Sequence, residues 1–283
     1  MSLRTIVGER TNARPAKSRV VFGMNTFTAN VPNDDGGRCE QASSAALSAS
    51  KAMSVDTVLI TGASRGIGRE VARTLATEGW HVLSGVRDAT KAPPGTQAET
   101  VDMSNAASID ALAQRLRARD QRLDALVNNA AIYDGTARDI WDVNVLGPLR
   151  LTAAVAPLLA RSARVVMVTS GLGRIGAQPV GLAKRLSARD LSLADLERLA
   201  REAPDGYGAS KAALTAMARV FAKALEPRGI LVNAISPGWV RTDMGGSSAP
   251  RSVEQGAASV LWGVRLPPGG PSGGVFQDGK TLA

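Results

Sequence analysis

A chain of 283 residues with 44% hydrophobic and 21% charged residues has room for one large or two small water-soluble domains, at about 150 residues per domain. Its one cysteine excludes an intramolecular disulfide. With one histidine, His81, the chain cannot form a zinc site from a cluster of His and Cys residues. A Ser-His-Asp triad would have to use His81. The net charge of +9 is spread along a chain with only 4% aromatic residues, which predicts a basic solvated surface and no nucleic-acid partner.

Residues 1–52 lack the hydrophobic periodicity of the rest of the chain and carry an excess of basic residues. They contain no apolar segment long enough for a secretory signal, and Glu9 with later acidic residues argues against an organellar transit peptide. Met53 lies just before the first predicted strand, 57–61. We interpret residues 1–52 as the product of a start codon placed too early or as a disordered extension, and we expect one folded domain over 53–283.

The longest nearly unbroken apolar stretch covers residues 151–160 and contains Pro157. It is about half as long as a membrane-spanning helix needs to be. With no targeting segment in view, we expect no membrane partner and a cytoplasmic location.

From residue 57 onward, short apolar runs typical of buried parallel strands alternate with helical patterns. The predicted strands lie at 57–61, 81–86, 99–101, 124–128, 164–169, 229–235 and 274–277. The predicted helices lie at 66–78, 105–119, 140–160, 206–225 and 252–263. Strands separated by helices and joined by right-handed crossovers predict an α/β fold with a doubly wound parallel sheet, the Rossmann fold.

Residues 182–204 interrupt this alternation. Ser192 is a candidate N-cap, and Asp195 three positions later nearly completes a capping box. We therefore expect an inserted helix in this segment rather than a loop.

A glycine-rich turn at residues 61–68 follows the first predicted strand and opens the first predicted helix. Gly62 permits a tight turn, while Gly66 and Gly68 let the backbone approach a pyrophosphate and the helix pack on the sheet. The amide groups at the start of that helix attract phosphates. Glycines in this position between a strand and a helix predict a dinucleotide-binding site.

The end of the second predicted strand indicates which dinucleotide is bound. Enzymes that use NAD usually place an Asp or Glu there, about 20 residues past the glycines, to hold the ribose hydroxyls. This chain has Arg87 followed by Asp88. Arg87, with Arg65 from the glycine-rich turn, would hold a 2′-phosphate, which predicts NADPH rather than NADH. The alternative is a solvated Arg87 with Asp88 on the ribose.

Tyr207 and Lys211 are four residues apart in a predicted helix and therefore share one of its faces. A cation beside a phenol favours the phenolate and lowers the phenol pKa, which suits the group to proton transfer near neutral pH. Ser170 ends the strand at 164–169 and so faces the sheet edge where such folds bind ligands. Without Ser170, the pair would also fit an ordinary amphipathic helix.

Together these segments resemble the short-chain dehydrogenase/reductase superfamily. The resemblance rests on the glycine motif at 61–68, Asn128-Asn129-Ala130-Ala131, Asn144, Ser170, the Tyr207/Lys211 pair and Pro237-Gly238. Within the superfamily, residues 207–214, 236–244 and 270–276 resemble the monomeric, NADPH-dependent carbonyl reductases. Ala131 departs from the family, which has a glycine there, and adds a methyl group beside the cofactor.

The resemblance implies an oxidoreductase that acts on CH-OH or C=O groups, with a small-molecule carbonyl substrate. Tyr207 would protonate the carbonyl oxygen as hydride arrives from the nicotinamide, and Ser170 would hydrogen-bond the same oxygen. Lys211 would lower the tyrosine pKa and hold the nicotinamide ribose. Asn144 would order a water that passes protons towards Lys211. The resemblance implies no metal.

The same resemblance implies a set of cofactor contacts. They are Gly62, Ser64, Arg65, Gly66, Ile67, Gly68, Arg87, Asp102, Met103, Asn129, Ala130, Ala131, Tyr207, Lys211, Pro237, Gly238, Val240 and Thr242. Trp239 is expected either to form a wall of the substrate pocket, beside Ser170 and Tyr207, or to pack in the core. The inserted segment before Tyr207 implies a monomer, because in the carbonyl reductases an added helix covers the surface that relatives use to dimerise.

Two other functions stay open. One is a ketoreductase or hydroxysteroid-type dehydrogenase with a specific metabolic substrate and the same catalytic residues. The other, from a different class, is a non-catalytic regulator that responds to NADPH and binds a partner. We expect such a regulator to have lost Tyr207 or Lys211, and both are present.

Overall fold

The computed structural model describes residues 55–204 and 206–282. The predicted N-terminal extension, residues 1–52, lies outside the described residues. None of the helices in the described part combines the length and the hydropathy that a bilayer-spanning segment requires.

In this part of the chain eight strands form one sheet with the spatial order β3-β2-β1-β4-β5-β6-β7-β8. Neighbouring strands from β3 to β7 pair in parallel, and β8 pairs antiparallel with β7. The strands are β1 (Thr57–Thr61), β2 (His81–Val86), β3 (Gln97–Thr100), β4 (Leu123–Asn128), β5 (Leu159–Val168), β6 (Leu231–Ile235), β7 (Val275–Gln277) and β8 (Lys280–Thr281). This is the doubly wound parallel sheet predicted from the sequence, and the fold class is confirmed.

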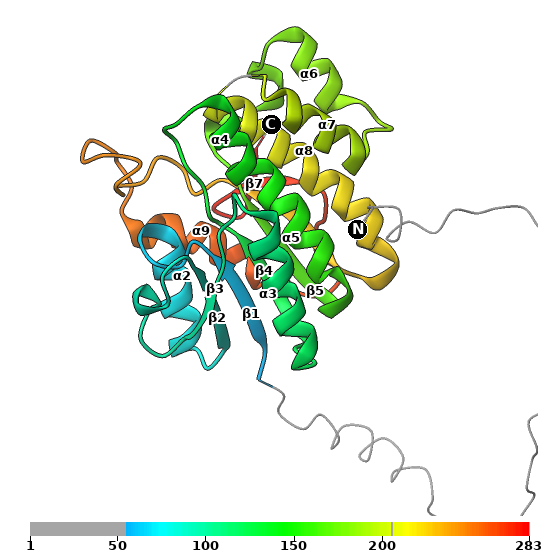
Figure 1. Cartoon of the computed structure of the whole chain (residues 1–283). Helices are drawn as coiled ribbons and strands as arrows, with labels where there is room; N and C mark the ends of the chain where they lie inside the picture. Colours follow the sequence, from blue (N-terminus) through cyan, green and yellow to red (C-terminus); the bar gives the residue numbers. More distant parts are fainter. Residues whose placement is uncertain (1–54, 205, 283) are drawn as a thin grey trace, which may run out of the picture. The chain divides into compact units, whose positions relative to one another are not determined.

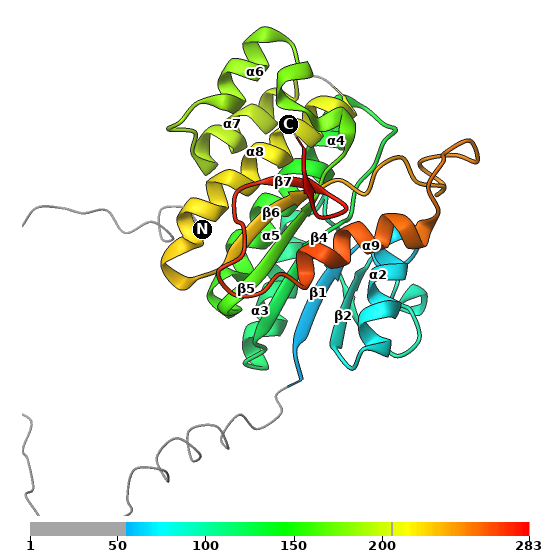
Figure 2. The ribbon, with the colours of Figure 1, turned by 180° about the vertical axis from the view of Figure 1, so that it is seen from behind.

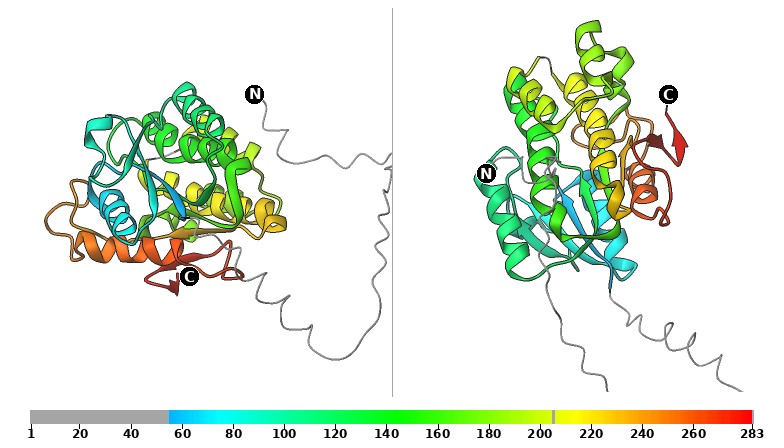
Figure 3. Two further views of the ribbon diagram at one scale, coloured as in Figure 1. Left: turned by 90° about the horizontal axis from the view of Figure 1, so that it is seen from below. Right: turned by 90° about the vertical axis from the view of Figure 1, so that its right-hand side faces the viewer.

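Helices cover both faces of the sheet (Figures 1 and 2). The α-helices are α2 (Gly66–Thr77), α3 (Ala106–Ala118), α4 (Ala137–Trp141), α5 (Gly147–Val155), α6 (Val180–Ser187), α7 (Leu193–Glu202), α8 (Tyr207–Leu225) and α9 (Val253–Val264). On one face α2 packs against α9, and on the other α3 packs against α5, which leaves the sheet between two helical layers (Figure 3). Strand side chains such as Val58 and Ile60 are buried with Val71 and Val260 of the α2/α9 layer. Burial on both faces explains why a central strand such as β1 is a short, mostly apolar run.

The predicted helix at 140–160 is wrong as a single element. The chain runs through α4, a π-helical turn η3 (Asp142–Leu146), α5 and a 3-10 turn η4 (Ala156–Leu158), and β5 already begins at Leu159. Two prolines account for the difference. Pro148 has no N–H to donate to the main-chain oxygen of Asn144, and the N–H of Gly147 donates to Asp142 in the π pattern. Pro157 lies in the last turn, where a proline ends the helical hydrogen bonding.

The predicted inserted helix is two helices, α6 and α7. The capping box of α7 is present, because Ser192 accepts from the N–H of Asp195 and the Asp195 carboxylate accepts from the N–H of Ser192. Helix α7 packs on α4, η3 and α8, and α6 packs on α8 (Figures 1 and 3). The insertion therefore covers the outer surface of the helix that begins at Tyr207.

Candidate active site

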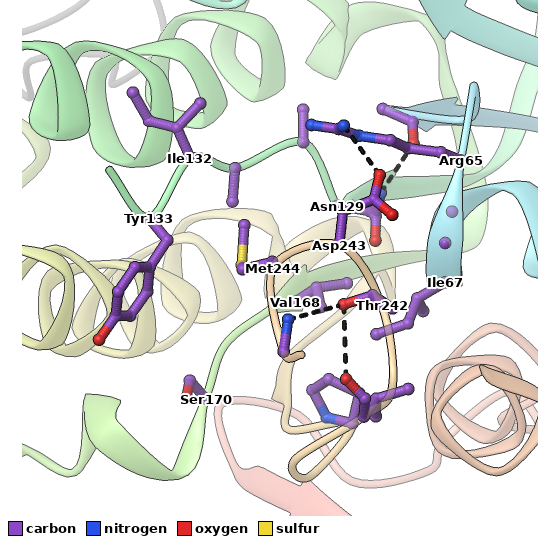
Figure 4. Close-up of a pocket in the computed structure, with 18 of the residues that line it drawn as sticks. Arg65, Ile67, Asn129, Ile132, Tyr133, Val168, Ser170, Thr242, Asp243 and Met244 are labelled. Carbon is purple, nitrogen blue, oxygen red and sulfur yellow. Dashed lines mark hydrogen bonds and ion pairs between the residues drawn. The ribbon is translucent and has the colours of Figure 1, made fainter. Parts of the chain in front are cut away.

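A cleft of about 1230 Å³ lies at the carboxyl ends of the strands. It is lined by the glycine-rich turn after β1 and by the segments that follow β2, β3, β4, β5 and β6 (Figure 4). Every residue that the sequence analysis assigned to cofactor or substrate lines this cleft, whereas Asn144 does not. The structure thus brings residues from 62 to 242 to one place.

The glycine-rich turn fits a dinucleotide because Gly62 and Gly68 leave no room for a side chain. Gly62 has a φ of +68°, and a Cβ there would lie 2.9 Å from Cα of Ala130. A Cβ on Gly68 would overlap the main-chain oxygen of Gly62 and the side-chain nitrogen of Asn129. The turn therefore presents bare backbone and the start of α2 to the cleft, which is the arrangement that holds a pyrophosphate.

The segment after β4 braces this turn. The hydroxyl of Thr61 accepts from the backbone N–H groups of Asn129 and Ala130, both at 3.1 Å. The side-chain nitrogen of Asn129 donates to the carbonyl oxygens of Thr61 at 2.9 Å and Gly62 at 3.2 Å. The Asn129 side chain therefore shapes the cofactor site by holding the glycine-rich turn in place.

The two arginines predicted to hold a 2′-phosphate both line the cleft, but Arg65 already has a partner. Its guanidinium forms an ion pair of 2.9 Å with Asp243 from the segment after β6 (Figure 4). Asp88, the alternative ribose ligand, does not line the cleft. Its carboxylate instead accepts from the hydroxyl and the N–H of Thr90, which lower its pKa. The geometry therefore favours Arg87 over Asp88 as the residue facing the cofactor.

Asp102 lies close to Arg87 at this end of the cleft. Hydrogen bonds from the hydroxyl and the N–H of Ser104 lower the pKa of Asp102, and the charge of Arg87 adds to the effect. The carboxylate therefore stays ionised at neutral pH and keeps an acceptor oxygen at the cleft wall.

Tyr207 is the first residue of α8, and the Ser170 side chain lies close enough to its hydroxyl to influence its pKa. Burial raises the pKa of Tyr207 to about 12, and the nearby Ser170 side chain acts in the opposite direction. Ser170 N-caps the 3-10 turn η5 (Gly171–Gly173), where its hydroxyl accepts from the N–H of Leu172. A Cβ on Gly173 would lie 2.8 Å from backbone and Cβ atoms of Lys211, so this turn packs directly on α8.

Lys211 lies one turn further along α8 and is only 2% exposed. Its Nζ donates to the carbonyl oxygen of Val168 at 2.8 Å and lies 5.6 Å from the centroid of the Tyr207 ring. Burial disfavours the ammonium and lowers the pKa of Lys211 to about 7. From its position in the sequence, Lys211 is expected to lower the pKa of Tyr207. In the structure the pKa of Tyr207 is raised instead, because burial outweighs the other influences on the phenol.

Asn144 is fully buried in the π-helical turn, and its side chain links two other segments by hydrogen bonds. Its amide oxygen accepts from the N–H of Ile132 at 2.9 Å, and its amide nitrogen donates to the Ile132 carbonyl and the Ser210 hydroxyl, both at 3.0 Å. Ser210 in turn donates to the carbonyl of Tyr207 at 2.7 Å. The side chain therefore fixes the segment after β4 to the start of α8, and both its oxygen and its nitrogen are engaged in these contacts.

Four large apolar side chains at the cleft are exposed: Tyr133, Leu172, Trp239 and Met244. Trp239 is 57% exposed and donates from its indole nitrogen to the Gly245 carbonyl, which excludes the core-packing interpretation. The centroids of the Tyr133 and Tyr207 rings lie 4.9 Å apart. Tyr133, Leu172 and Met244 were not predicted from the sequence. The available signal was their position, each within a few residues of a motif that ends a strand.

Comparison with known proteins identifies the family. Residues 56–181 match the family model described as short chain dehydrogenase, and residues 191–261 match the model described as Enoyl-(Acyl carrier protein) reductase. The short-chain dehydrogenase anuI of Penicillium roqueforti is 33% identical over 72% of this chain and 86% of its own length. The chain belongs to the short-chain dehydrogenase/reductase family. This dehydrogenase/reductase is therefore an oxidoreductase.

The resemblance to carbonyl reductases is confirmed as well. The protein named carbonyl reductase [NADPH] 1 from Sus scrofa is 30% identical over 79% of this chain and 92% of its own length. The NADPH-bound carbonyl reductase from chicken fatty liver has 26% identity and a TM-score of 0.62, over 81% of this chain and 94% of that one. Salutaridine reductase from Papaver somniferum, at 24% identity and a TM-score of 0.69, shares the fold over 79% of this chain and 99% of that one.

Proposed function

We propose that this enzyme reduces a ketone or aldehyde to an alcohol with NADPH. The observation that supports this most directly is that Ser170 and Tyr207 line the same cleft as the glycine-rich turn, with the Ser170 side chain near the phenol. One end of the cleft suits a phosphorylated dinucleotide, and the other presents a hydroxyl pair to a carbonyl oxygen. Hydride transfer to a carbonyl group requires that the dinucleotide and the carbonyl compound bind in the same cleft.

The residues that would hold NADPH are the glycine-rich turn, Arg87, Asp102 and the Pro237–Thr242 segment. When bound, NADPH supplies the hydride. Arg87 faces the cleft while Asp88 is turned to Thr90, which favours a 2′-phosphate over a free ribose hydroxyl. The relatives named above as NADPH carbonyl reductases support the same choice.

Tyr207 is the general acid of the proposed reaction. With a pKa raised to about 12, its phenol stays protonated at neutral pH, which is the state that a reduction needs. As the carbonyl oxygen gains negative charge, Ser170 stabilises it by a hydrogen bond and Tyr207 donates its proton. The reverse oxidation would need the phenolate and is disfavoured by the same burial.

Lys211 and Asn144 would restore the proton on Tyr207. A pKa of about 7 lets the Lys211 amine gain or lose a proton near neutral pH, and its Nζ lies beside the tyrosine ring. Pro148 leaves the main-chain oxygen of Asn144 without the donor that a regular helix supplies, so that oxygen is suited to hold a water. We assign Asn144 this role through its backbone.

A ketoreductase with a specific metabolic substrate remains the second candidate. The model matched by residues 191–261 is named for an acyl-carrier substrate, which is one such metabolic substrate. The 3-oxoacyl-[acyl-carrier-protein] reductase of Synechocystis, 28% identical over 68% of this chain and 77% of its own length, points the same way. The rim of four exposed apolar side chains argues against this second candidate, because it suits a bulky apolar carbonyl compound.

The decisive experiment is an NADPH-oxidation screen over aromatic, quinone, aliphatic and steroid carbonyl compounds and 3-oxoacyl thioesters, repeated with NADH. We expect turnover of at least one apolar carbonyl compound, faster with NADPH. Turnover of 3-oxoacyl thioesters alone would select the ketoreductase. Tight NADPH binding with no turnover of any compound would select the non-catalytic regulator.

We also propose that the enzyme is a monomer, because α6 and α7 cover α4 and α8. Size-exclusion chromatography with light scattering measures this directly, and a stable dimer or tetramer would refute it.

A further inference from the structure

Arg251 lies between the segment after β6 and the start of α9, and its guanidinium joins three parts of the molecule. Its two terminal nitrogens form a forked ion pair with the Asp278 carboxylate, at 2.7 and 2.8 Å. One of them also donates to the main-chain oxygen of Gln255 in the first turn of α9 at 3.0 Å. Asp278 belongs to the turn that connects β7 and β8. A fork of this kind fixes both the position and the plane of the guanidinium.

The stem of Arg251 supports the turn at Pro237–Gly238. Gly238 has a φ of +77°, and a Cβ there would lie only 2.5 Å from Cδ and 2.9 Å from Nε of Arg251. The backbone of Arg251 also donates to Trp239 at 3.2 Å and accepts from Arg241 at 2.9 Å. The stem and the backbone of Arg251 thus contact the segment from Gly238 to Arg241, while its guanidinium is held by Asp278 and Gln255.

Asp278 is itself held firmly. It has a φ of +51°, a left-handed conformation that is unfavourable for a residue with a side chain. Its N–H donates to the Ser259 hydroxyl at 2.9 Å, and that hydroxyl donates to the Ser236 carbonyl at 2.9 Å. Nε of Arg251 is buried without a hydrogen-bond partner among the described residues. The terminal nitrogens alone therefore orient the guanidinium, and Asp278 is their anchor.

The supported turn lies at the reacting end of the cleft. Strand β6, which leads into Pro237, pairs with β5, which leads into Ser170, and the N–H of Thr169 donates to the carbonyl of Ile235 at 2.9 Å. Pro237, Gly238 and Trp239 line the same cleft as Ser170 and Tyr207. The glycine-rich turn follows β1 and Arg87 follows β2. Both strands are separated from β5 and β6 by β4 in the sheet. Arg251, which also lines the cleft, directly contacts the Gly238–Arg241 segment at the Ser170 and Tyr207 end and not the glycine-rich turn or Arg87.

We propose that Arg251, anchored by Asp278, is a positioning residue that sets the Pro237–Trp239 turn against the nicotinamide half of NADPH and the substrate. The proposal rests on the function proposed above. It makes the turn after β7 part of the active-site support, although Asp278 itself does not line the cleft.

The test compares the two halves of the cofactor in the full-length enzyme. Arg251→Lys keeps the charge but loses the fork, and Asp278→Asn keeps the shape but loses the charge. We expect each variant to raise the dissociation constant of NADPH, measured by its fluorescence, about tenfold and to lower kcat. The affinity for adenosine 2′,5′-bisphosphate, which occupies only the Arg87 half, should change less than about twofold. A variant that merely unfolds would lose both ligands equally.

Arg265→Lys is the matched control. Arg265 follows α9 at its other end, pairs with Glu78 and does not line the cleft, so NADPH affinity should stay at the wild-type value. Equal losses for NADPH and the bisphosphate, or no loss for either, would overturn the positioning role. A wild type that binds NADPH but reduces no carbonyl compound would refute the proposed function, while the binding comparison would still decide the role of Arg251. A wild type that binds no NADPH would refute both.

Discussion

The two halves of the cleft are built in different ways. Around β1 and β4 the site is backbone: glycines that admit no Cβ, braced by Thr61 and Asn129. Around β5 and β6 it is side chains: Ser170, Tyr207 and an apolar rim, held from behind by long-range contacts such as Arg251 with Asp278. The cofactor half therefore tolerates almost no substitution in its turn, whereas the substrate half can change its rim and keep its chemistry.

Tyr207→Phe should separate the roles of the two halves of the cleft most clearly. The variant removes the proton donor and keeps the ring, so kcat should fall about 10³-fold while NADPH affinity stays within about twofold. Steady-state kinetics and fluorescence titration measure the two quantities separately. A variant that retained most of its kcat would contradict the assignment of the general acid.

Gly68→Ala should act on the opposite half. The added methyl overlaps the Gly62 carbonyl and the Asn129 amide, so the unfolding free energy should fall by about 1–3 kcal/mol, and the NADPH dissociation constant should rise more than about tenfold. Urea unfolding and fluorescence titration check this. Gly181→Ala in α6 is the control, because a Cβ there meets nothing within 4 Å, and its stability should be unchanged or slightly higher.

Arg87→Ala tests the identity of the cofactor. Loss of a charge-assisted contact to a 2′-phosphate should raise KM for NADPH roughly 10- to 100-fold and leave KM for NADH nearly unchanged. Asp88→Ala should have little effect on either, since Asp88 bonds to Thr90 outside the cleft. Equal effects of Arg87→Ala on both cofactors would contradict the phosphate assignment.

Burial of Lys211 predicts a pH-dependent stability. Its pKa is about 7 when folded and near 10.5 when unfolded, so between these values the unfolded chain binds more protons. The unfolding free energy should therefore rise as pH increases from 7 towards 10, by on the order of a few kcal/mol. Urea unfolding at pH 7 and 9.5 measures it. Lys211→Met should remove the rise, and Lys223→Met, which removes an exposed lysine of the same helix, should not.

Asp243→Asn should give the smallest effect. The Arg65–Asp243 pair is exposed, and such pairs contribute about 0–1 kcal/mol. Freeing Arg65 for a phosphate should tighten NADPH binding about two- to fivefold, less at high salt, and leave NADH unaffected. Glu197→Gln removes the same charge from α7, where Glu197 pairs with Arg201, and should change neither affinity. Weaker NADPH binding in Asp243→Asn would show that the Arg65–Asp243 ion pair instead helps to keep the cofactor in the cleft.

The parts of this structure that depend on local chemistry could be predicted from the sequence. Buried parallel strands are apolar runs, and a tight turn needs Gly62, so β1, β2 and the cofactor turn were predicted at or near their bounds. The sequence also predicted the cap of α7 at Ser192.

Features that depend on distant contacts were missed. Pro148 and Pro157 can be read from the sequence. Their effect on helix geometry, however, depends on which carbonyl groups lack hydrogen-bond donors once the segment is packed. The Arg251–Asp278 pair joins residues far apart in sequence, and nothing in either neighbourhood indicates the other. The position of Tyr133 against Tyr207 likewise follows only from the three-dimensional course of two loops.

The contact between Gly173 and the backbone of α8 limits how this enzyme can be engineered. With no side chain between them, η5 and α8 form one unit, so Ser170 and Tyr207 keep a fixed spacing whatever compound enters. New specificities must therefore come from residues that frame the compound rather than from those that activate it. Libraries that vary Trp239 and Met244 should yield active variants, whereas libraries that vary Gly173 should yield inactive ones.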